Sequence, residues 1–283
     1  MLQKIVRALP NLSRLPEIVA CCRETRQWRA VTFAYLGLRG LDYPYKLRLR
    51  TGEVLTFAER NDVVIFWLVF VRQHYPVRRS DRLIVDVGAN IGQFTIYAQR
   101  HAPGSRVIAI EPFPDTCERL REHLVENHIS DRVTVLNCAL MRESGRGKMD
   151  SVGNIPSQYR RIDARETRAL NLEHRGTAAL EDVPGIDVEQ RTLSDVLDMV
   201  DASVDLLKMN IHGSEYAVLM STPGQVLKRL RRIAVQYHTL PASENMGKTQ
   251  LFSYLKQNGF RVTRDRDTLQ GSGLAVLEQS SAL

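Results

Sequence analysis

The residues with the clearest chemical potential are a carboxylate, two glycines and an asparagine, spaced as Asp86-x-Gly88-x-Asn90-x-Gly92. Glycine lets the backbone approach a ligand closely, and asparagine tolerates the left-handed conformation that such turns often need. A second carboxylate, Glu111, follows Gly92 by 19 residues, at the end of the next apolar run. An acidic side chain in that place can accept hydrogen bonds from both hydroxyls of a ribose.

The glycine spacing separates two classes of nucleotide-binding protein. Dinucleotide enzymes carry Gly-x-Gly-x-x-Gly, in which the amides of a helix bind a pyrophosphate. The spacing here is different, so an adenosine cofactor without phosphates fits better. A nicotinamide-dependent oxidoreductase is the alternative that this spacing disfavours.

Alternating strands and helices must position these side chains. Short apolar runs of strand length are separated by segments with helical periodicity, and this predicts a doubly wound α/β fold with a mostly parallel sheet. The candidate strands are 83–87, 106–110, 132–136, 204–209 and 232–237, and the candidate helices are 93–101, 115–127, 193–200 and 214–220.

The last part of the chain changes character. A helix near 248–257 precedes two strands, which begin near Gly259 and Gly273 and are joined by a short polar loop. They predict an antiparallel hairpin at the sheet edge, which brings the sheet to seven strands. The alternation also fails between 142 and 188, a long insertion that we interpret as a candidate acceptor region.

Residues 1–80 form an N-terminal extension before a domain at 81–283. Helix-spaced apolar residues up to about residue 40 predict short helices, and alternation around Thr51-Gly52 predicts a hairpin. Asn61-Asp62 can cap a helix that runs through Tyr75, where Pro76 stops it.

The formal charge of +7 is concentrated in this extension. Residues 1–80 hold 14 basic and 6 acidic residues, a net charge of +8, which leaves −1 for the rest. Such a segment could contact an anionic membrane or an acidic glycan carrier. Solvated helix faces are the favoured explanation of the charge, because basic helices are common. We expect no nucleic-acid partner.

Composition limits the compartment. A hydrophobic content of 43% excludes wholesale disorder. The longest apolar run, 63–71, is too short to span a bilayer, and no secretory signal is recognisable. Four cysteines without metal-binding spacing predict reduced thiols. We therefore expect a cytoplasmic protein, with membrane-peripheral contact as the variant that the basic extension suggests.

Several motifs together resemble one family. Residues 85–92, followed by Ile110-Glu111-Pro112, resemble the FkbM family of S-adenosylmethionine-dependent methyltransferases. Further matches lie at 137–140, 192–195 and 205–215, so the resemblance covers roughly residues 81–238 in the right order. It implies a Rossmann-like class I methyltransferase fold and S-adenosyl-L-methionine as the cofactor.

The resemblance also implies which residues bind the cofactor. The first turn would contact its methionine end, Glu111 its ribose, Phe113 the adenine ring, and Asn137 would lie near the adenine amine. Alternatively, Asp86 caps the following helix and Phe113 is a core aromatic. The predicted cofactor residues are Asp86, Gly88, Asn90, Gly92, Glu111, Phe113 and Asn137.

The fourth strand ends in a motif similar to the family pattern Lys-x-Asp-x-Glu-Gly-x-Glu. This chain keeps Lys208, Gly213 and Glu215 but has Asn210 and His212 where acids are usual. Gln236 likewise stands where glutamate is frequent. These changes remove negative charge that hard cations require, so we predict no metal site.

A histidine, with a reference pKa of about 6.5, is a better base at neutral pH than a carboxylate. His212 is therefore the candidate base, with Lys208 or His238 orienting the acceptor. Alternatively, His212 is a loop residue satisfied by its neighbours. The predicted activity is O-methylation of a hydroxyl on a sugar, glycan intermediate or polyhydroxylated metabolite. The alternative is a catalytically silent cofactor-binding scaffold. The sequence encodes neither the acceptor's identity nor the oligomeric state.

Overall fold

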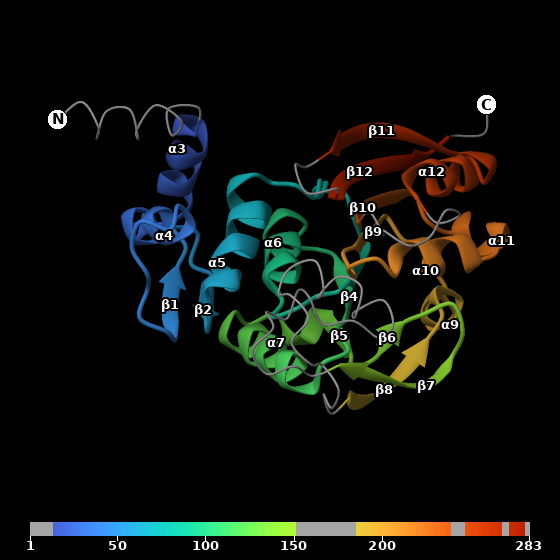
Figure 1. Cartoon of the computed structure of the whole chain (residues 1–283), viewed down its shortest axis with the longest axis horizontal. Helices are drawn as coiled ribbons and strands as arrows, with labels where there is room; N and C mark the ends of the chain where they lie inside the picture. Colours follow the sequence, from blue (N-terminus) through green and yellow to red (C-terminus); the bar gives the residue numbers. More distant parts are fainter. Residues whose placement is uncertain (1–13, 151–184, 239–246, 268–271, 281–283) are drawn as a thin grey trace, which may run out of the picture.

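A seven-stranded sheet forms the centre of the computed structural model, which describes residues 14–150, 185–238, 247–267 and 272–280 (Figure 1). The strand order is β11-β12-β10-β9-β3-β4-β5. Only β12 runs antiparallel to its neighbours β10 and β11. The doubly wound, mostly parallel sheet with a terminal hairpin is thus confirmed. Its strands are β3 Leu83–Val87, β4 Arg106–Ile110, β5 Val133–Leu136, β9 Leu206–Met209, β10 Arg232–His238, β11 Phe260–Asp267 and β12 Ser272–Gln279.

The central strand, β3, is buried at all five of its residues, which explains its continuous apolar run. Its register aligns Val87 with Ile110 of β4 and with Met209 of β9. The carboxyl ends of these three parallel strands therefore meet at one edge of the sheet, where ligands bind in open α/β folds.

Helices cover both faces of the sheet. Phe94 of α6 and Leu120 of α7 belong to one apolar cluster with Ile84 of β3. Leu197 of α9 and Leu251 of α12 belong to a second cluster, with Val85. Within the described parts of the chain, no helix is both long and apolar enough to cross a membrane. The helices are α6 Gln93–His101, α7 Pro114–Glu126, a short 3-10 turn Ser130–Arg132, α9 Leu193–Asp198, α10 Glu215–Ser221, α11 Gly224–Leu227 and α12 Lys248–Gln257.

The N-terminal segment folds into two helices, a hairpin and a third helix. These elements are α3 Leu15–Glu24, α4 Trp28–Tyr35, β1 Tyr45–Arg48, β2 Val54–Phe57 and α5 Arg60–Phe66. The hairpin is confirmed, but the following helix differs from its prediction. Glu59, rather than Asn61, is its N-cap residue, and Asp62 completes a capping box. The helix continues as a π-helical turn, η1 Trp67–Val71, and ends there rather than at Tyr75.

This segment shares one apolar core with the sheet. Cys21 and Val31 lie in the same cluster as Ile84 of β3. The Tyr35 ring stacks on the Trp67 ring with centroids 4.2 Å apart. The expected domain boundary at residue 80 therefore does not coincide with a gap in the packing.

The insertion at 142–188 begins and ends in strands, which the sequence did not suggest. β7 Gly145–Asp150 pairs antiparallel with β8 Gly185–Arg191, and β6 Ala139–Leu140 completes a three-stranded sheet. These strands were not predicted, and they form a separate sheet outside the seven-stranded one. The rest of the insertion, 151–184, lies outside the described residues.

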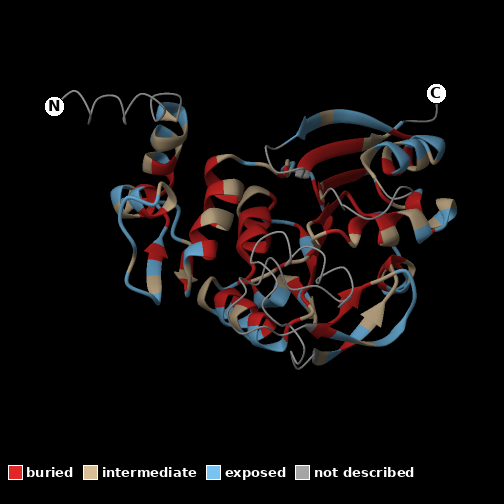
Figure 2. Ribbon diagram, in the orientation of Figure 1, coloured by how far each residue is buried: buried red, intermediate tan, exposed pale blue. Residues whose placement is uncertain are grey.

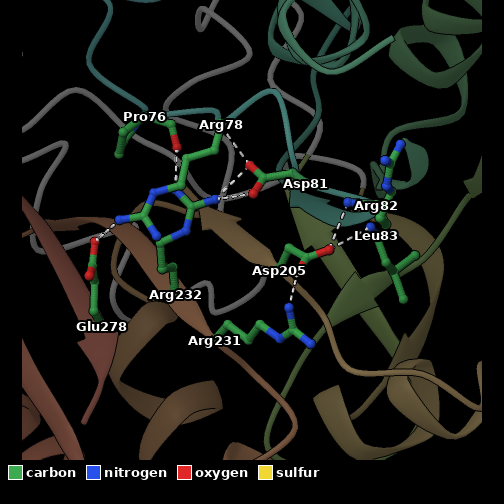
Figure 3. Close-up of polar contacts among 9 residues, drawn as sticks. All are labelled: Pro76, Arg78, Asp81, Arg82, Leu83, Asp205, Arg231, Arg232 and Glu278. Carbon is green, nitrogen blue, oxygen red and sulfur yellow. Dashed lines mark hydrogen bonds and ion pairs between the residues drawn. The ribbon is translucent and has the colours of Figure 1, made fainter. Parts of the chain in front are cut away.

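Polar contacts hold the sheet at the amino ends of its strands (Figure 3). Arg232, at the start of β10, is buried and donates to both carboxylate oxygens of Asp81. Asp205, just before β9, accepts from the backbone N–H groups of Arg82 at 2.7 Å and Leu83 at 3.1 Å. These contacts fix β3, β9 and β10 at the end of the sheet opposite to the carboxyl edge.

Candidate active site

A pocket lies at the carboxyl ends of β3, β4 and β9. Its lining combines the turns after these strands with apolar side chains from the N-terminal segment. The lining residues are Ile65, Leu68, Val69, Tyr75, Val87, Gly88, Ala89, Asn90, Phe94, Ile110, Glu111, Pro112, Phe113, Cys138, Ala139, Leu140, Met149, Lys208, Asn210, Ile211, His212, Ser214 and Gln236.

The first turn needs glycine at its closest approach to β9. Gly88 has φ +72°, and a Cβ atom there would lie 2.2 Å from the backbone oxygen of Asn210. The N–H groups of Gly88 and Ala89 both donate to the carbonyl of Ile110 at 3.0 Å. The first turn is therefore packed tightly against the other two strand ends, and its backbone lines the pocket.

Glu111 is buried at the end of β4 and lines the pocket, the position that the sequence predicted. Its carboxylate accepts from the backbone N–H of Asn90 at 2.8 Å and from that of Phe113 at 3.2 Å. Burial raises the pKa of Glu111 to about 7, although the two hydrogen bonds favour its ionised form. Glu111 is thus a titratable group near neutral pH, held between two turns of the site.

Asp86 and Lys208 form a buried ion pair beside the pocket. Lys208 Nζ lies 2.8 Å from Asp86 Oδ1 and also donates to the carbonyl of Gly88 at 2.8 Å. The other oxygen of Asp86 accepts from Thr95 Oγ1 at 2.7 Å. Both charged groups hold the first turn in place, so we assign them a positioning role. Direct contact of either one with cofactor or acceptor stays a prediction.

The remaining predicted cofactor residues divide into two kinds. Asn90, with φ +50°, and the buried Phe113 line the pocket. Gly92 instead starts α6 at φ +83°, and the exposed Asn137 donates to the carbonyl of Glu111 at 2.9 Å. Among the residues that the structure places, neither Gly92 nor Asn137 belongs to the pocket lining. In the structure they shape the turns that carry the lining residues.

The turn after β9 brings two histidines together. His212 lines the pocket at φ +53°, and the centroids of its ring and the His238 ring are 4.9 Å apart. Glu215 is fully buried and accepts from the N–H groups of Ile211 at 2.8 Å and Gly213 at 2.6 Å. The same carboxylate lies 3.1 Å from His238 Nδ1. Glu215 therefore fixes both the turn that carries His212 and the ring that lies beside it.

Two amides and a phenol line the pocket next to this turn. Asn210 Nδ2 donates to Gln236 Oε1 at 3.2 Å, and Tyr75 OH donates to the same oxygen at 3.1 Å. Asn210 Oδ1 is buried and has no hydrogen-bond partner among the groups that the structure describes. Burial raises the pKa of Tyr75, which keeps the phenol protonated. This wall offers neutral hydrogen-bonding groups.

Sequence reasoning missed the apolar wall. Ile65, Leu68 and Val69 line the pocket from α5 and the π-helical turn, so the N-terminal segment helps to build the site. The apolar run at 63–71 was the available signal, because such a run is buried against something. Single π-helical turns occur frequently at functional sites.

Acidic side chains at the site are already engaged by protein groups. Asp86 is bound by Lys208, and Glu215 is bound by backbone N–H groups and His238. In the described part of the chain, no group of three or more His, Cys, Asp or Glu side chains is arranged to hold a metal ion.

Comparison with known proteins identifies the family. Residues 86–262 match the family described as the methyltransferase FkbM domain. Methyltransferase sdnD of Sordaria araneosa is 29% identical over 220 residues, which cover 71% of this chain and 83% of that protein. The 31-O-demethyl-FK506 methyltransferase FkbM of Streptomyces tacrolimicus is 29% identical over 219 residues, which cover 71% of this chain and 80% of that protein. Methyltransferase 1 of Beauveria bassiana is 26% identical over 205 residues, which cover 70% and 80%. Because the matched segment is more than half of the chain and contains the three strand ends of the pocket, the chain belongs to the FkbM methyltransferase family.

Proposed function

We propose that this methyltransferase uses S-adenosyl-L-methionine to methylate a hydroxyl of a sugar, glycan intermediate or other polyhydroxylated metabolite. One observation carries the proposal: a single pocket places a buried carboxylate, Glu111, and a histidine, His212, at the ends of different strands. A carboxylate can accept hydrogen bonds from the hydroxyls of a ribose, and an imidazole can take the proton of an acceptor hydroxyl. A relative's name also supports a hydroxyl acceptor, because it describes methylation at an oxygen of FK506.

The residues of the pocket fit the cofactor. Glu111 would accept from the ribose hydroxyls, and Phe113 offers an apolar surface for the adenine ring. Gly88 and Asn90, which line the pocket in the turn after β3, would contact the methionine end. When bound, the cofactor supplies a methyl group on a positively charged sulfur.

His212 would take the proton of the acceptor hydroxyl. A neutral imidazole can accept a proton near neutral pH, and a well-placed general base typically contributes a hundred- to ten-thousand-fold in rate, roughly. His238, anchored by Glu215, lies beside it and would restrict its orientation. The amides of Asn210 and Gln236 would bind neighbouring hydroxyls. The apolar residues Leu68 and Val69 would exclude water from the reacting groups.

The proposal is tested by incubating the protein with methyl-labelled cofactor and a library of sugars, glycolipid intermediates and other polyols. Mass spectrometry of the products should show the label on a hydroxyl oxygen. The matched control is His212→Asn, because asparagine tolerates the positive φ of this position but cannot act as the base. Label on nitrogen or carbon would contradict O-methylation.

A second candidate function is a cofactor-binding scaffold without methyl transfer. The observation that favours it is that Lys208, a candidate for orienting the acceptor, is engaged by Asp86 and by the carbonyl of Gly88 instead. A wild-type protein that binds the cofactor but labels no compound in the library would support the scaffold over the enzyme.

A further inference from the structure

Exposed apolar side chains are concentrated on the N-terminal helices. Among the residues that the structure describes, eight large hydrophobic side chains are exposed, and five of them lie between residues 15 and 43. Figure 2 shows exposed residues, in pale blue, in the region of α3 and α4. The five residues, with their exposed fractions, are Leu15 (50%), Val19 (48%), Phe33 (44%), Leu38 (64%) and Tyr43 (36%).

The charges of the same two helices are segregated. Glu17 and Glu24, the only acids in 14–40, are turned toward the protein. Glu17 accepts from Trp67 Nε1 at 2.6 Å and pairs with Arg72. Glu24, which is buried, pairs with Arg100 at 2.6 Å. Both acids are therefore neutralised by arginines from outside this segment.

Four arginines of the helices and of the turns that follow them are exposed to solvent. Arg23, Arg26, Arg29 and Arg39 are all exposed, and no acid of the segment lies among them. The exposed positions recur four residues apart, as Leu15, Val19 and Arg23 on α3 and as Arg29 and Phe33 on α4, so each helix has one exposed side. We call these residues, together with the exposed Arg26, Leu38 and Arg39 of the adjoining turns, the α3–α4 face. Net charge alone could not have shown this arrangement, because the inward direction of the two acids is a property of the fold.

We propose that the α3–α4 face binds the surface of a bilayer that contains anionic lipids. Arginines bind lipid phosphates, while aliphatic and aromatic side chains enter the boundary between headgroups and acyl chains. Leu15 and Val19 are one helical turn apart on α3, so both can enter together. Nucleic acid would use the charge but leave the exposed leucines and valine without a partner. This inference does not rest on the proposed function.

Trp28 provides a local probe of the interaction. The chain has two tryptophans, and Trp67 is fully buried. Trp28 is half-buried, and the Arg29 guanidinium lies 5.3 Å from its ring centroid. Amphipathic aromatic rings favour the membrane interface. A change in fluorescence on adding vesicles should therefore come from Trp28, and Trp28→Phe should remove it.

The direct test is sedimentation of the full chain with vesicles of phosphatidylcholine and phosphatidylglycerol, compared with pure phosphatidylcholine. Binding should require the anionic lipid and weaken as salt rises. The triple change Arg23→Gln, Arg26→Gln and Arg29→Gln should reduce the partition coefficient about a hundredfold, roughly fivefold for each charge. The matched control removes three exposed arginines elsewhere, by Arg106→Gln, Arg121→Gln and Arg261→Gln. It should change partition by no more than about fivefold.

A second pair of variants tests the apolar part of the face. Leu15→Ser with Val19→Ser should lower partition at least about tenfold, because two aliphatic side chains no longer leave water. Val125→Ser with Val262→Ser is the control, since both valines are exposed on other elements. Equal losses in test and control variants would overturn the α3–α4 face as the binding surface. Equal binding to neutral vesicles, or no binding at low salt, would overturn the anionic bilayer.

Discussion

Glu111 and His212 reach the same pocket from different strand ends, and their chemistry assigns them different partners. Glu111 is buried and linked to two backbone N–H groups, an arrangement suited to a rigid ligand such as a ribose. His212 lies on a turn that the buried Glu215 holds by accepting hydrogen bonds from the backbone N–H groups of Ile211 and Gly213. If Glu111 binds the cofactor and His212 is the base, as we propose, their pH dependences can be measured separately, through cofactor binding and through turnover.

For His212 we expect turnover at saturating cofactor to rise with pH through one ionisation, because only the neutral imidazole can take the acceptor's proton. His212→Ala should lower turnover about a hundredfold or more and leave cofactor affinity nearly unchanged, because a base acts on the acceptor. His212→Glu should move the rising limb to lower pH, since a glutamate has a reference pKa of about 4.3. Steady-state rates across pH provide the measurement.

The variant His212→Asn separates the loss of a base from backbone strain. His212 has φ +53°, a conformation that asparagine adopts more readily than alanine. Both variants should lose turnover equally if the imidazole nitrogen is what matters. Near-normal turnover with an unchanged pH profile in either variant would reject His212 as the base and leave orientation as the mechanism.

For Glu111 we expect cofactor affinity to depend on pH near neutrality. Its pKa in the free protein is raised to about 7 by burial, and ribose hydroxyls bind best to the carboxylate form. The affinity for the cofactor should therefore be highest above about pH 7, where Glu111 is ionised. It should fall at lower pH, because Glu111 must lose its proton before the carboxylate can bind the hydroxyls. Calorimetry at a series of pH values measures this directly.

Two variants check the assignment of Glu111. Glu111→Ala should weaken binding by roughly 2 to 3 kcal/mol, because the hydroxyls lose a charged acceptor in a buried site. Glu111→Gln keeps the size of the side chain and should bind weakly with no pH dependence between 6 and 8, roughly the range of the ionisation. An unchanged dissociation constant in both would show that Glu111 does not contact the cofactor.

The sequence allowed the positions of side chains that follow strands to be predicted. It did not allow contacts between side chains of neighbouring strands to be predicted. Gly88, Glu111 and His212 could be placed because each ends or follows an apolar run. The ion pair of Asp86 with Lys208 depends on the register of β3 with β9, which puts these residues opposite each other. A sequence does not display that register, so Asp86 was expected to bind cofactor rather than lysine.

The turn after β3 lies so close to the turn after β9 that position 88 has room only for glycine. Gly88→Ala should abolish measurable cofactor binding and lower the melting temperature, because the new Cβ would lie 2.2 Å from a backbone oxygen. Gly259→Ala is the matched control, since Gly259 has φ +89° and a Cβ added there would have no atom within 4 Å. It carries the same conformational strain without the clash. Equal effects of the two substitutions would contradict the steric explanation.

The N-terminal helices share an apolar core with the sheet, because Cys21 and Val31 lie in one cluster with Ile84 of β3. Tyr35→Ala should destabilise the protein by roughly 2 kcal/mol, because the ring stacks on Trp67 in the core. Phe33→Ala should cost much less, because Phe33 is exposed. Denaturant unfolding of both variants measures the difference. If a variant that lacks residues 1–38 kept the wild-type free energy of unfolding and bound the cofactor, the shared core would be contradicted.

Elements were predictable where apolar runs were bounded by polar residues. β3, β4 and α6 have the predicted boundaries. β7 was missed because Gly145-Arg-Gly-Lys-Met-Asp holds two glycines and one apolar side chain, so only its pairing with β8 makes it a strand. The π-helical turn has no sequence signal of its own, because its extra residue reflects packing against neighbouring helices.

At the scale of the whole molecule, the two ends of the sheet have different roles. A buried ion pair, Arg232 with Asp81, and the backbone hydrogen bonds to Asp205 fix the amino ends, and the pocket occupies the carboxyl ends. The N-terminal segment contributes to two surfaces, because α5 and the π-helical turn wall the pocket while α3 and α4 present a basic, apolar face. An enzyme held on a bilayer through that face would meet lipid-linked acceptors at high local concentration.

We propose that the pocket at the ends of β3, β4 and β9 binds S-adenosyl-L-methionine. The most direct measurement is calorimetric titration of the full-length protein with this cofactor at about pH 8, where Glu111 is ionised. We predict one site per chain, with binding that Glu111→Gln weakens and His212→Asn leaves unchanged. No detectable binding at roughly millimolar cofactor would contradict this proposal, because the binding free energy would then be weaker than about −4 kcal/mol.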